Sequence, residues 1–142
     1  MNTIDLEKIL QDTLAKFNSE TGTIHRLDME TQLLHLVAQV GLPPQLLDIV
    51  KTIPVGKGIA GETVAKNRPV TICHLQTDTS GVTKPGAKQT GVGGAVCVPI
   101  RAGDKIIGTF GIGTRSEREY SAAEINALQD IANSLAVKIA EA

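Results

Sequence analysis

Apolar residues recur every three or four positions near both ends of the chain, and this spacing predicts a helix at each terminus. In the first of these helices acidic residues come early and Lys16 comes late, as the helix dipole favours. Its apolar positions, within residues 4–17, are Ile4, Leu6, Ile9, Leu10, Leu14 and Phe17. We expect terminal helices over about 3–17 and 121–141.

The last helix has a well-defined start. Ser121 and Glu124 have the S-x-x-E spacing of a capping box, in which each side chain binds the other residue's backbone N–H. Apolar residues follow at alternating three- and four-residue steps: Ile125, Leu128, Ala132, Leu135 and Ile139. We call these five residues the C-terminal seam. Their spacing is typical of a helical bundle and favours a partner helix.

Short apolar runs between the helices predict strands. Residues 22–28 and 33–41 read as an antiparallel pair across a polar turn at 29–32. Residues 94–100 and 105–114 read as a second pair, joined by a turn that contains Gly103 and Asp104. This second pair is apolar on successive residues, which indicates a sheet covered on both faces.

The middle of the chain predicts short helices, one further strand and a long loop. Prolines after Gly41 end the second strand, and a helix should follow over 45–53. A second short helix should cover 58–67, and a strand 68–75. Residues 76–93 show no periodicity, and a loop of that length is often functional.

These elements predict one α+β domain over residues 1–142. Its centre would be an antiparallel sheet with the terminal helices on one face. The short helices and the long loop would lie on the other face, where a ligand pocket could form.

Two segments carry a family resemblance. VGKGIAGETVAKNRPVTI at 55–72 and GAVCVPIRAGDKIIGTFGIGTR at 94–115, followed by the capped helix, resemble a GAF domain. GAF domains are small sensory modules that enclose a ligand pocket or serve as dimer elements. The resemblance covers almost the whole chain and implies the GAF/PAS-like sheet described above.

Composition limits the partners. The formal net charge is −1, so no basic field attracts nucleic acid or an anionic membrane. No apolar run approaches the ~20 residues of a membrane span. The first residues lack a basic segment before an apolar run and so do not resemble a signal peptide. We therefore expect a cytoplasmic protein without nucleic-acid or membrane partners.

The expected ligand site surrounds Gly58-Ile59-Ala60-Gly61, which opens the second short helix. Free N–H groups at a helix start favour a small anion or a carboxylate. The alternative is that the glycines only allow a tight turn and close packing. The complete set of expected ligand-binding residues is Gly58, Ile59, Ala60, Gly61, Cys73, His74, Asp78 and Thr79. No metal-ligand spacing is present, and we expect neither a metal nor a cofactor.

The enzymatic members of the family set a further test. Free methionine sulfoxide reductases carry a cysteine in a G-[IV]-C-G turn and another in the long loop. Here Ala60 occupies the turn position, and residues 76–93 contain no cysteine. Cys73 and Cys97 fall in strand-like runs instead. The cyclic-nucleotide and bilin signatures are also incomplete. We expect no catalytic residues.

The resemblance implies a sensor that binds a small anionic or carboxylate-bearing molecule. We expect a homodimer formed by the C-terminal seam together with Leu6, Leu10 and Phe17, and an output partner such as a kinase, cyclase or transcription factor. One alternative is a dimerisation or protein-interaction module without ligand. Another is a divergent enzyme related to the methionine sulfoxide reductases.

Overall fold

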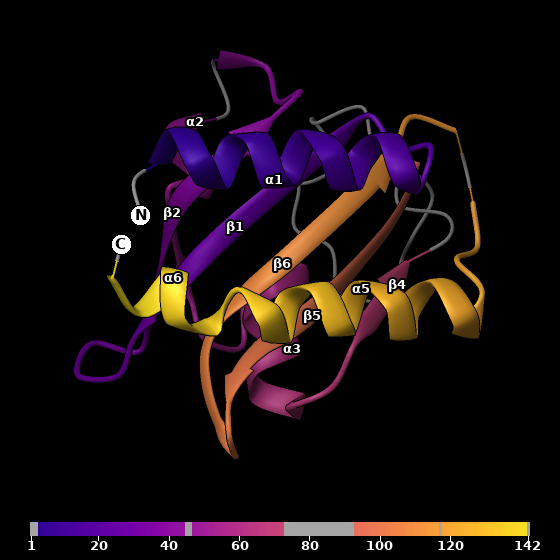
Figure 1. Cartoon of the computed structure of the whole chain (residues 1–142). Helices are drawn as coiled ribbons and strands as arrows, with labels where there is room; N and C mark the ends of the chain where they lie inside the picture. Colours follow the sequence, from indigo (N-terminus) through magenta and orange to yellow (C-terminus); the bar gives the residue numbers. More distant parts are fainter. Residues whose placement is uncertain (1–2, 45–46, 73–92, 117, 142) are drawn as a thin grey trace.

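A computed structural model describes residues 3–44, 47–72, 93–116 and 118–141. Its centre is a six-stranded sheet in the order β3-β2-β1-β6-β5-β4, in which every neighbouring pair is antiparallel (Figure 1). The strands are β1 (Thr21–Asp28), β2 (Leu33–Val40), β3 (Thr52–Pro54), β4 (Val70–Ile72), β5 (Gly94–Ala102) and β6 (Lys105–Thr114). No helix in the described ranges is long and apolar enough to span a membrane.

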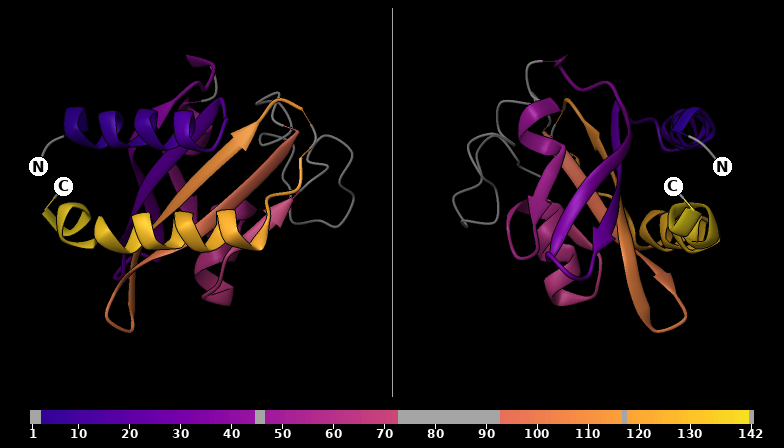
Figure 2. Two further views of the ribbon diagram at one scale, coloured as in Figure 1. Left: turned by 45° about the vertical axis from the view of Figure 1, so that its right-hand side comes forward. Right: turned by 90° about the vertical axis from the view of Figure 1, so that its left-hand side faces the viewer.

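Helices cover both faces of this sheet. One face carries α1 (Thr3–Lys16), α5 (Ala122–Ser134) and α6 (Ala136–Glu141), and we call it the helix face. The other carries α2 (Leu47–Val50) and α3 (Gly58–Lys66), and we call it the cavity face. The edge-on view separates the two layers clearly (Figure 2). This confirms the predicted α+β class and the placement of the terminal helices. Of the loop predicted over 76–93, residues 76–92 lie outside the described residues.

The main core lies between the sheet and the terminal helices. Leu6, Leu10, Leu128 and Ile139 are fully buried there, and Phe110 of β6 packs with them. Burying one such side chain contributes ~1.5–3 kcal/mol to folding. The apolar stripes of both terminal helices are therefore packed against the sheet of the same chain.

This burial corrects the reason given for a dimer. Leu135 is 2% exposed and Phe17 5%, so the C-terminal seam and the stripe of the first helix are already covered. An apolar stripe wider than the sheet can cover does not exist at these positions. Dimerisation stays a prediction, but it needs other residues.

The predicted helix over 45–53 is wrong in its second half. Among the described residues the α-helix comprises Leu47–Val50, and Thr52–Pro54 forms β3 against residues 33–35 of β2. The β-branched Thr52 and Ile53 favour a strand, and Pro54 is tolerated because β3 is an edge strand. Pairing with the edge of β2 therefore makes this segment a strand and not a continuation of the helix.

Two further boundaries differ from expectation. The strand predicted over 68–75 starts at Val70, because Pro69 has no N–H to give to the sheet. Its part beyond Ile72 lies outside the described residues. The last helix divides into α5 and α6 at Leu135, whose N–H bonds to Ala132 three residues back instead of four. The capping box of Ser121 and Glu124 is confirmed, with bonds of 3.1 and 2.9 Å.

Candidate ligand-binding cavity

The cavity face holds a partly open pocket of about 290 Å³ beneath α2, β3 and the start of α3. We call it the cavity. Its described walls come from β1, the segment after β2, α2, β3, α3, β5 and β6. The described lining residues are Thr21, Gly22, Thr23, His25, Leu42, Ile49, Val50, Thr52, Ile53, Pro54, Lys57, Gly58, Ile59, Ala60, Ala95, Val96, Cys97, Gly111, Ile112 and Gly113.

Small residues on the floor leave this space open. In β6 the side chains of Phe110 and Ile112 pack into the helix-side core, and Gly111 between them faces the cavity. A Cβ atom at Gly111 would lie 3.4 Å from Thr23 Oγ1 and 3.7 Å from Cys97 Sγ, which are ordinary contacts. Glycine is therefore not required there by neighbouring atoms. Its effect is to leave volume unfilled.

The start of α3 brings polar groups to this space. Lys57 occupies the N-cap position without a side-chain hydrogen bond, and Gly58, Ile59 and Ala60 line the cavity. Gly61 N–H is the first in the helix to bond back, to the carbonyl of Lys57 at 3.0 Å. The three N–H groups before it have no acceptor within the helix. Anion binding at these groups stays a prediction.

The glycines of this turn also have conformational reasons. Gly58 has a φ of +63°, which glycine adopts without strain. A Cβ atom on Gly61 would lie 2.4 Å from the carbonyl oxygen of Pro54. Each of these two glycines thus has a conformational or packing reason of its own. Neither reason conflicts with anion binding, because that uses only backbone N–H groups.

His25 is a site residue that the sequence reading missed. It lies on β1, lines the cavity and is 1% exposed. Its Nε2 lies 2.8 Å from the carbonyl oxygen of Val50 in α2. Since that oxygen only accepts, Nε2 carries the hydrogen and Nδ1 is an acceptor. Nδ1 is buried and has no partner among the described residues.

Burial decides the charge of this histidine. Desolvation lowers the pKa of His25 to about 4, although the bond to Val50 acts in the opposite direction. The ring is therefore neutral near pH 7. The only clue in the sequence is its position two residues before Leu27, which places both side chains on the cavity face of one strand.

Cys97 lines the floor with a fully buried thiol. Desolvation raises the pKa of this thiol to about 11. A thiol of that kind is a weak nucleophile, because the thiolate is the reactive species. Its burial was expected from the apolar run around it.

The predicted site residues divide into three groups. Gly58, Ile59 and Ala60 line the cavity, and Gly61 lies buried beside them at the contact with Pro54. Cys73, His74, Asp78 and Thr79 lie outside the described residues. The walls contributed by α2 and β3 were not predicted, because that segment was read as one continuous helix. Within the described ranges no three His, Cys, Asp or Glu side chains gather as metal ligands.

Solved structures share this architecture. A GAF domain from an Acinetobacter phosphoenolpyruvate-protein phosphotransferase is 19% identical, with a TM-score of 0.81 over 99% of this chain and 84% of that chain. A type II free methionine-R-sulfoxide reductase from Thermoplasma acidophilum is 20% identical, with a TM-score of 0.79 over 96% and 91%. A methionine sulfoxide reductase of Staphylococcus aureus in its reduced form is 22% identical, with a TM-score of 0.69 over 94% and 82%.

At these identities the solved structures establish a common fold and no shared chemistry. A search of curated protein sequences gave no match. The sequence model of the GAF domain family, in contrast, matches residues 4–140, which is nearly the whole chain. With the curled antiparallel sheet and the helices on both faces, this match shows that the chain belongs to the GAF domain family.

Proposed function

We propose that this GAF domain is a sensor that binds a small molecule with a negative charge in the cavity. One observation carries the proposal: a space of about 290 Å³ with mostly apolar walls meets the first N–H groups of α3, which have no acceptor within the helix, and the cation of Lys57. An apolar site with a few convergent polar groups is the usual form of a small-molecule site. A helix start favours an anion over a cation.

The fold offers a physical route for the signal. β1, β5 and β6 line the cavity on one face and support the terminal helices on the other. A ligand that shifts these strands would move α1 and α5, which present their outer surfaces to a partner. We propose a kinase, cyclase or transcription factor as the output. One structural neighbour is the GAF domain of a phosphotransferase, which supports a signalling partner.

The direct test is a thermal-shift screen with small carboxylic acids and inorganic oxyanions. A ligand at 100 times its Kd should stabilise the native domain by ~2.7 kcal/mol. Gly111→Leu should abolish the shift of ligands that extend over the cavity floor, because its side chain would occupy that part of the cavity. Ala65→Leu, on the exposed side of α3, is the matched control and should keep the wild-type shift.

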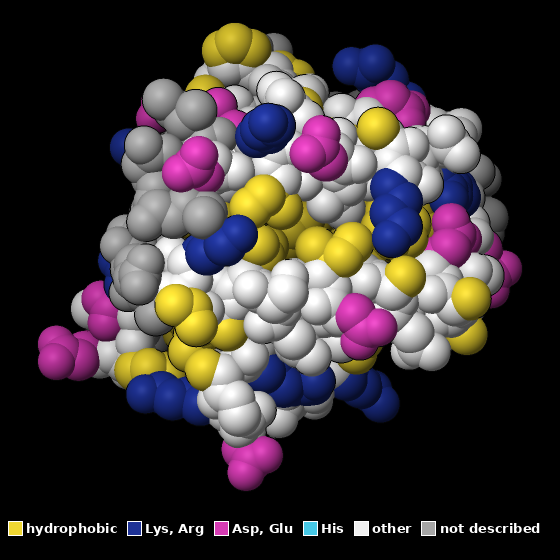
Figure 3. Space-filling model, viewed as in Figure 1, with side chains coloured by type: hydrophobic (Ala, Val, Ile, Leu, Met, Phe, Trp, Pro, Cys, Tyr) yellow, Lys and Arg dark blue, Asp and Glu magenta, His cyan; other side chains and the backbone are white. Residues whose placement is uncertain are grey.

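A domain without ligand is the second candidate. A furrow with apolar atoms runs between α1 and α5 on the helix face (Figure 3), and this surface could serve an interaction module with an unused cavity. The screen separates the two functions. If no acid or oxyanion stabilises the wild type, the sensor proposal fails and the interaction module takes its place.

We also propose that the domain is not an enzyme. Two structural neighbours are methionine sulfoxide reductases, and that chemistry needs a reactive cysteine. The residue at the turn position is Ala60, and Cys97 has a thiol pKa of about 11. An assay for reduction of free methionine sulfoxide tests this. Turnover that disappears in Cys73→Ala or Cys97→Ala would contradict the proposal.

A further inference from the structure

Charge is distributed unevenly over the cavity wall. Lys57 is the only charged residue among the described lining residues, and it adjoins the N–H groups of Gly58, Ile59 and Ala60, which have no acceptor within the helix. The rest of the described wall consists of aliphatic side chains, glycines, threonines, Cys97 and His25. The described wall can therefore neutralise one negative charge of a ligand, and it can do so at the start of α3.

His25 excludes itself as a second anion site. Its one N–H is used by the Val50 carbonyl at 2.8 Å, so the ring offers only the lone pair of Nδ1. A lone pair repels a carboxylate oxygen. A ligand carboxylate is thus directed away from His25 and toward the start of α3.

A second charge on the ligand would be costly. Away from the mouth at the half-exposed Ile49, it would lie against walls formed by residues such as Val50, Ile53 and Ala95. An ion in such surroundings, without a partner, loses far more in hydration than the contacts return. Dicarboxylates, phosphorylated sugars and nucleotides are therefore poor ligands for the described part of the cavity. An aliphatic segment of the ligand, in contrast, gains binding free energy when it leaves water for these walls.

We propose that the cavity selects aliphatic monocarboxylates, with the carboxylate at the start of α3 and the chain over the floor formed by Gly111 and Ala95. This inference rests on the proposed sensor function and names its ligand class. The volume of about 290 Å³ has room for roughly ten groups the size of a water molecule, at ~30 Å³ each. Acids of about eight to ten carbons should fill it.

The test is isothermal titration of the wild-type domain with straight-chain carboxylates from butyrate to tetradecanoate, each below its micellar concentration. Affinity should rise about fourfold per methylene, the fold-change that ~0.8 kcal/mol per CH₂ gives, and should stop rising at about eight to ten carbons. The primary alcohols of the same lengths should bind more weakly than the acids. Succinate and glutarate should not bind.

Two variants locate the ends of the ligand. Gly111→Leu adds four carbons to the floor, so the preferred acid should become shorter by about three to four carbons. Lys57→Gln should weaken all acids about two- to fivefold, as expected for an exposed charge, and should leave the alcohols unchanged. Lys66→Gln, at the other end of α3, is the matched control and should change neither series.

Each of the other possible outcomes contradicts one stated part of the proposal. If compact anions such as nitrate, phosphate or succinate bind and the aliphatic acids do not, the ligand class is wrong and the sensor proposal stands. If alcohols bind as tightly as acids, the carboxylate position is wrong. If the preferred length does not change in folded Gly111→Leu, the chain does not lie on this floor. If no compound binds at all, both the class and the sensor proposal fail.

Discussion

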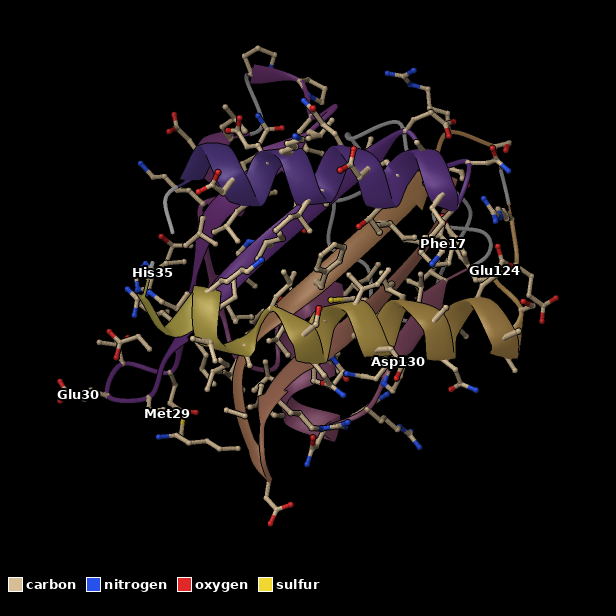
Figure 4. The ribbon with its side chains drawn as sticks, in the orientation of Figure 1. Phe17, Met29, Glu30, His35, Glu124 and Asp130 are labelled. Carbon is tan, nitrogen blue, oxygen red and sulfur yellow. The ribbon has the colours of Figure 1, made fainter. Side chains whose placement is uncertain are left out.

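Arg118 donates a hydrogen bond from Nη1 to the carbonyl oxygen of Phe17, 101 positions earlier in the chain, at 2.6 Å. The same nitrogen lies 3.2 Å from the carbonyl of Asn18, and Nη2 pairs with Glu124. Figure 4 shows Phe17 and Glu124 close together at one end of the molecule. One guanidinium thus satisfies carbonyls after the end of α1 and binds the capping residue of α5. It ties the two terminal helices together.

Arg118→Gln should lower the free energy of unfolding by about 1.5–3 kcal/mol, the contribution of hydrogen bonds to a charged group. Urea denaturation measures the change. The control is Lys66→Gln, which removes only the exposed pair with Glu62 and should cost less than ~0.5 kcal/mol. Equal losses in the two variants would show that Arg118 does not hold the helices together.

His25 should make stability depend on pH. The unfolded histidine takes up a proton near pH 6.5, whereas the folded one does so only near pH 4. Stability from this group is therefore fully present above pH 6.5 and is lost as pH falls toward 4. The loss corresponds to about 3 kcal/mol, since each pH unit between the two values is worth ~1.36 kcal/mol.

The measurement compares wild type with His25→Gln by urea denaturation from pH 7.5 to 4. Taking the difference between the two proteins removes the contribution of other titrating groups. The wild-type advantage should shrink by about 3 kcal/mol on acidification. A difference that stays constant with pH would show that His25 is protonated in the folded state.

Two glycines should respond oppositely to alanine. Gly61→Ala places a Cβ atom 2.4 Å from the Pro54 carbonyl oxygen, so α3 must move away from β3. We expect a loss of about 1–3 kcal/mol, typical of overpacking. Gly111→Ala makes ordinary contacts at 3.4 Å with Thr23 and 3.7 Å with Cys97, and it should be neutral or stabilising by up to ~1 kcal/mol. Thermal denaturation of the two variants measures these changes. A destabilised Gly111→Ala protein would mean that the cavity floor is already filled.

Cys97 should resist thiol reagents in the folded protein. At a pKa of about 11 its thiolate is about a hundredfold scarcer than at the ordinary value of 9, and burial blocks access as well. The experiment uses Cys73→Ala protein, in which Cys97 is the remaining cysteine. A disulfide reagent should modify it only after urea is added. Rapid labelling of the native protein would show that the thiol is exposed and reactive.

The domain should form a homodimer through the helix face. Val137 of α6 is 69% exposed and is an apolar residue that the core does not cover. Light scattering at high micromolar concentration should give twice the chain mass, and Val137→Glu should reduce it to one chain. Met29→Glu changes an equally apolar residue at the β1–β2 turn, 51% exposed, and should leave the dimer intact. A wild-type monomer mass would contradict dimerisation directly.

The elements that could be predicted from the sequence are those whose pattern lies within a few consecutive residues. Ser121 and Glu124 form a cap from four consecutive residues, and the apolar spacing of α1 needs no distant partner. Thr52–Pro54 could not be assigned in this way, because the edge of β2 that it pairs with lies seventeen or more positions earlier. Edge strands of three residues carry too little pattern of their own.

Of the candidate site, only the start of α3 could be predicted from the sequence, because only there does the pattern lie in neighbouring residues. Gly58 and Gly61 mark a turn that the sequence displays, whereas His25 looks like any strand histidine until Val50 is placed beside it. Burial alone makes it neutral, and burial depends on the whole fold. The open floor at Gly111 is likewise a property of three adjacent strands.

In β6, Phe110 and Gly111 are neighbours in sequence but belong to opposite layers of the molecule. A substitution at Gly111 can reshape the ligand space, while the packing that keeps the domain folded depends on Phe110 and Ile112 on the reverse side. The shape of the cavity can therefore drift by single codon changes with little loss of stability. Chains that share this sheet can carry differently shaped cavities, so a ligand found for one of them would say little about the next.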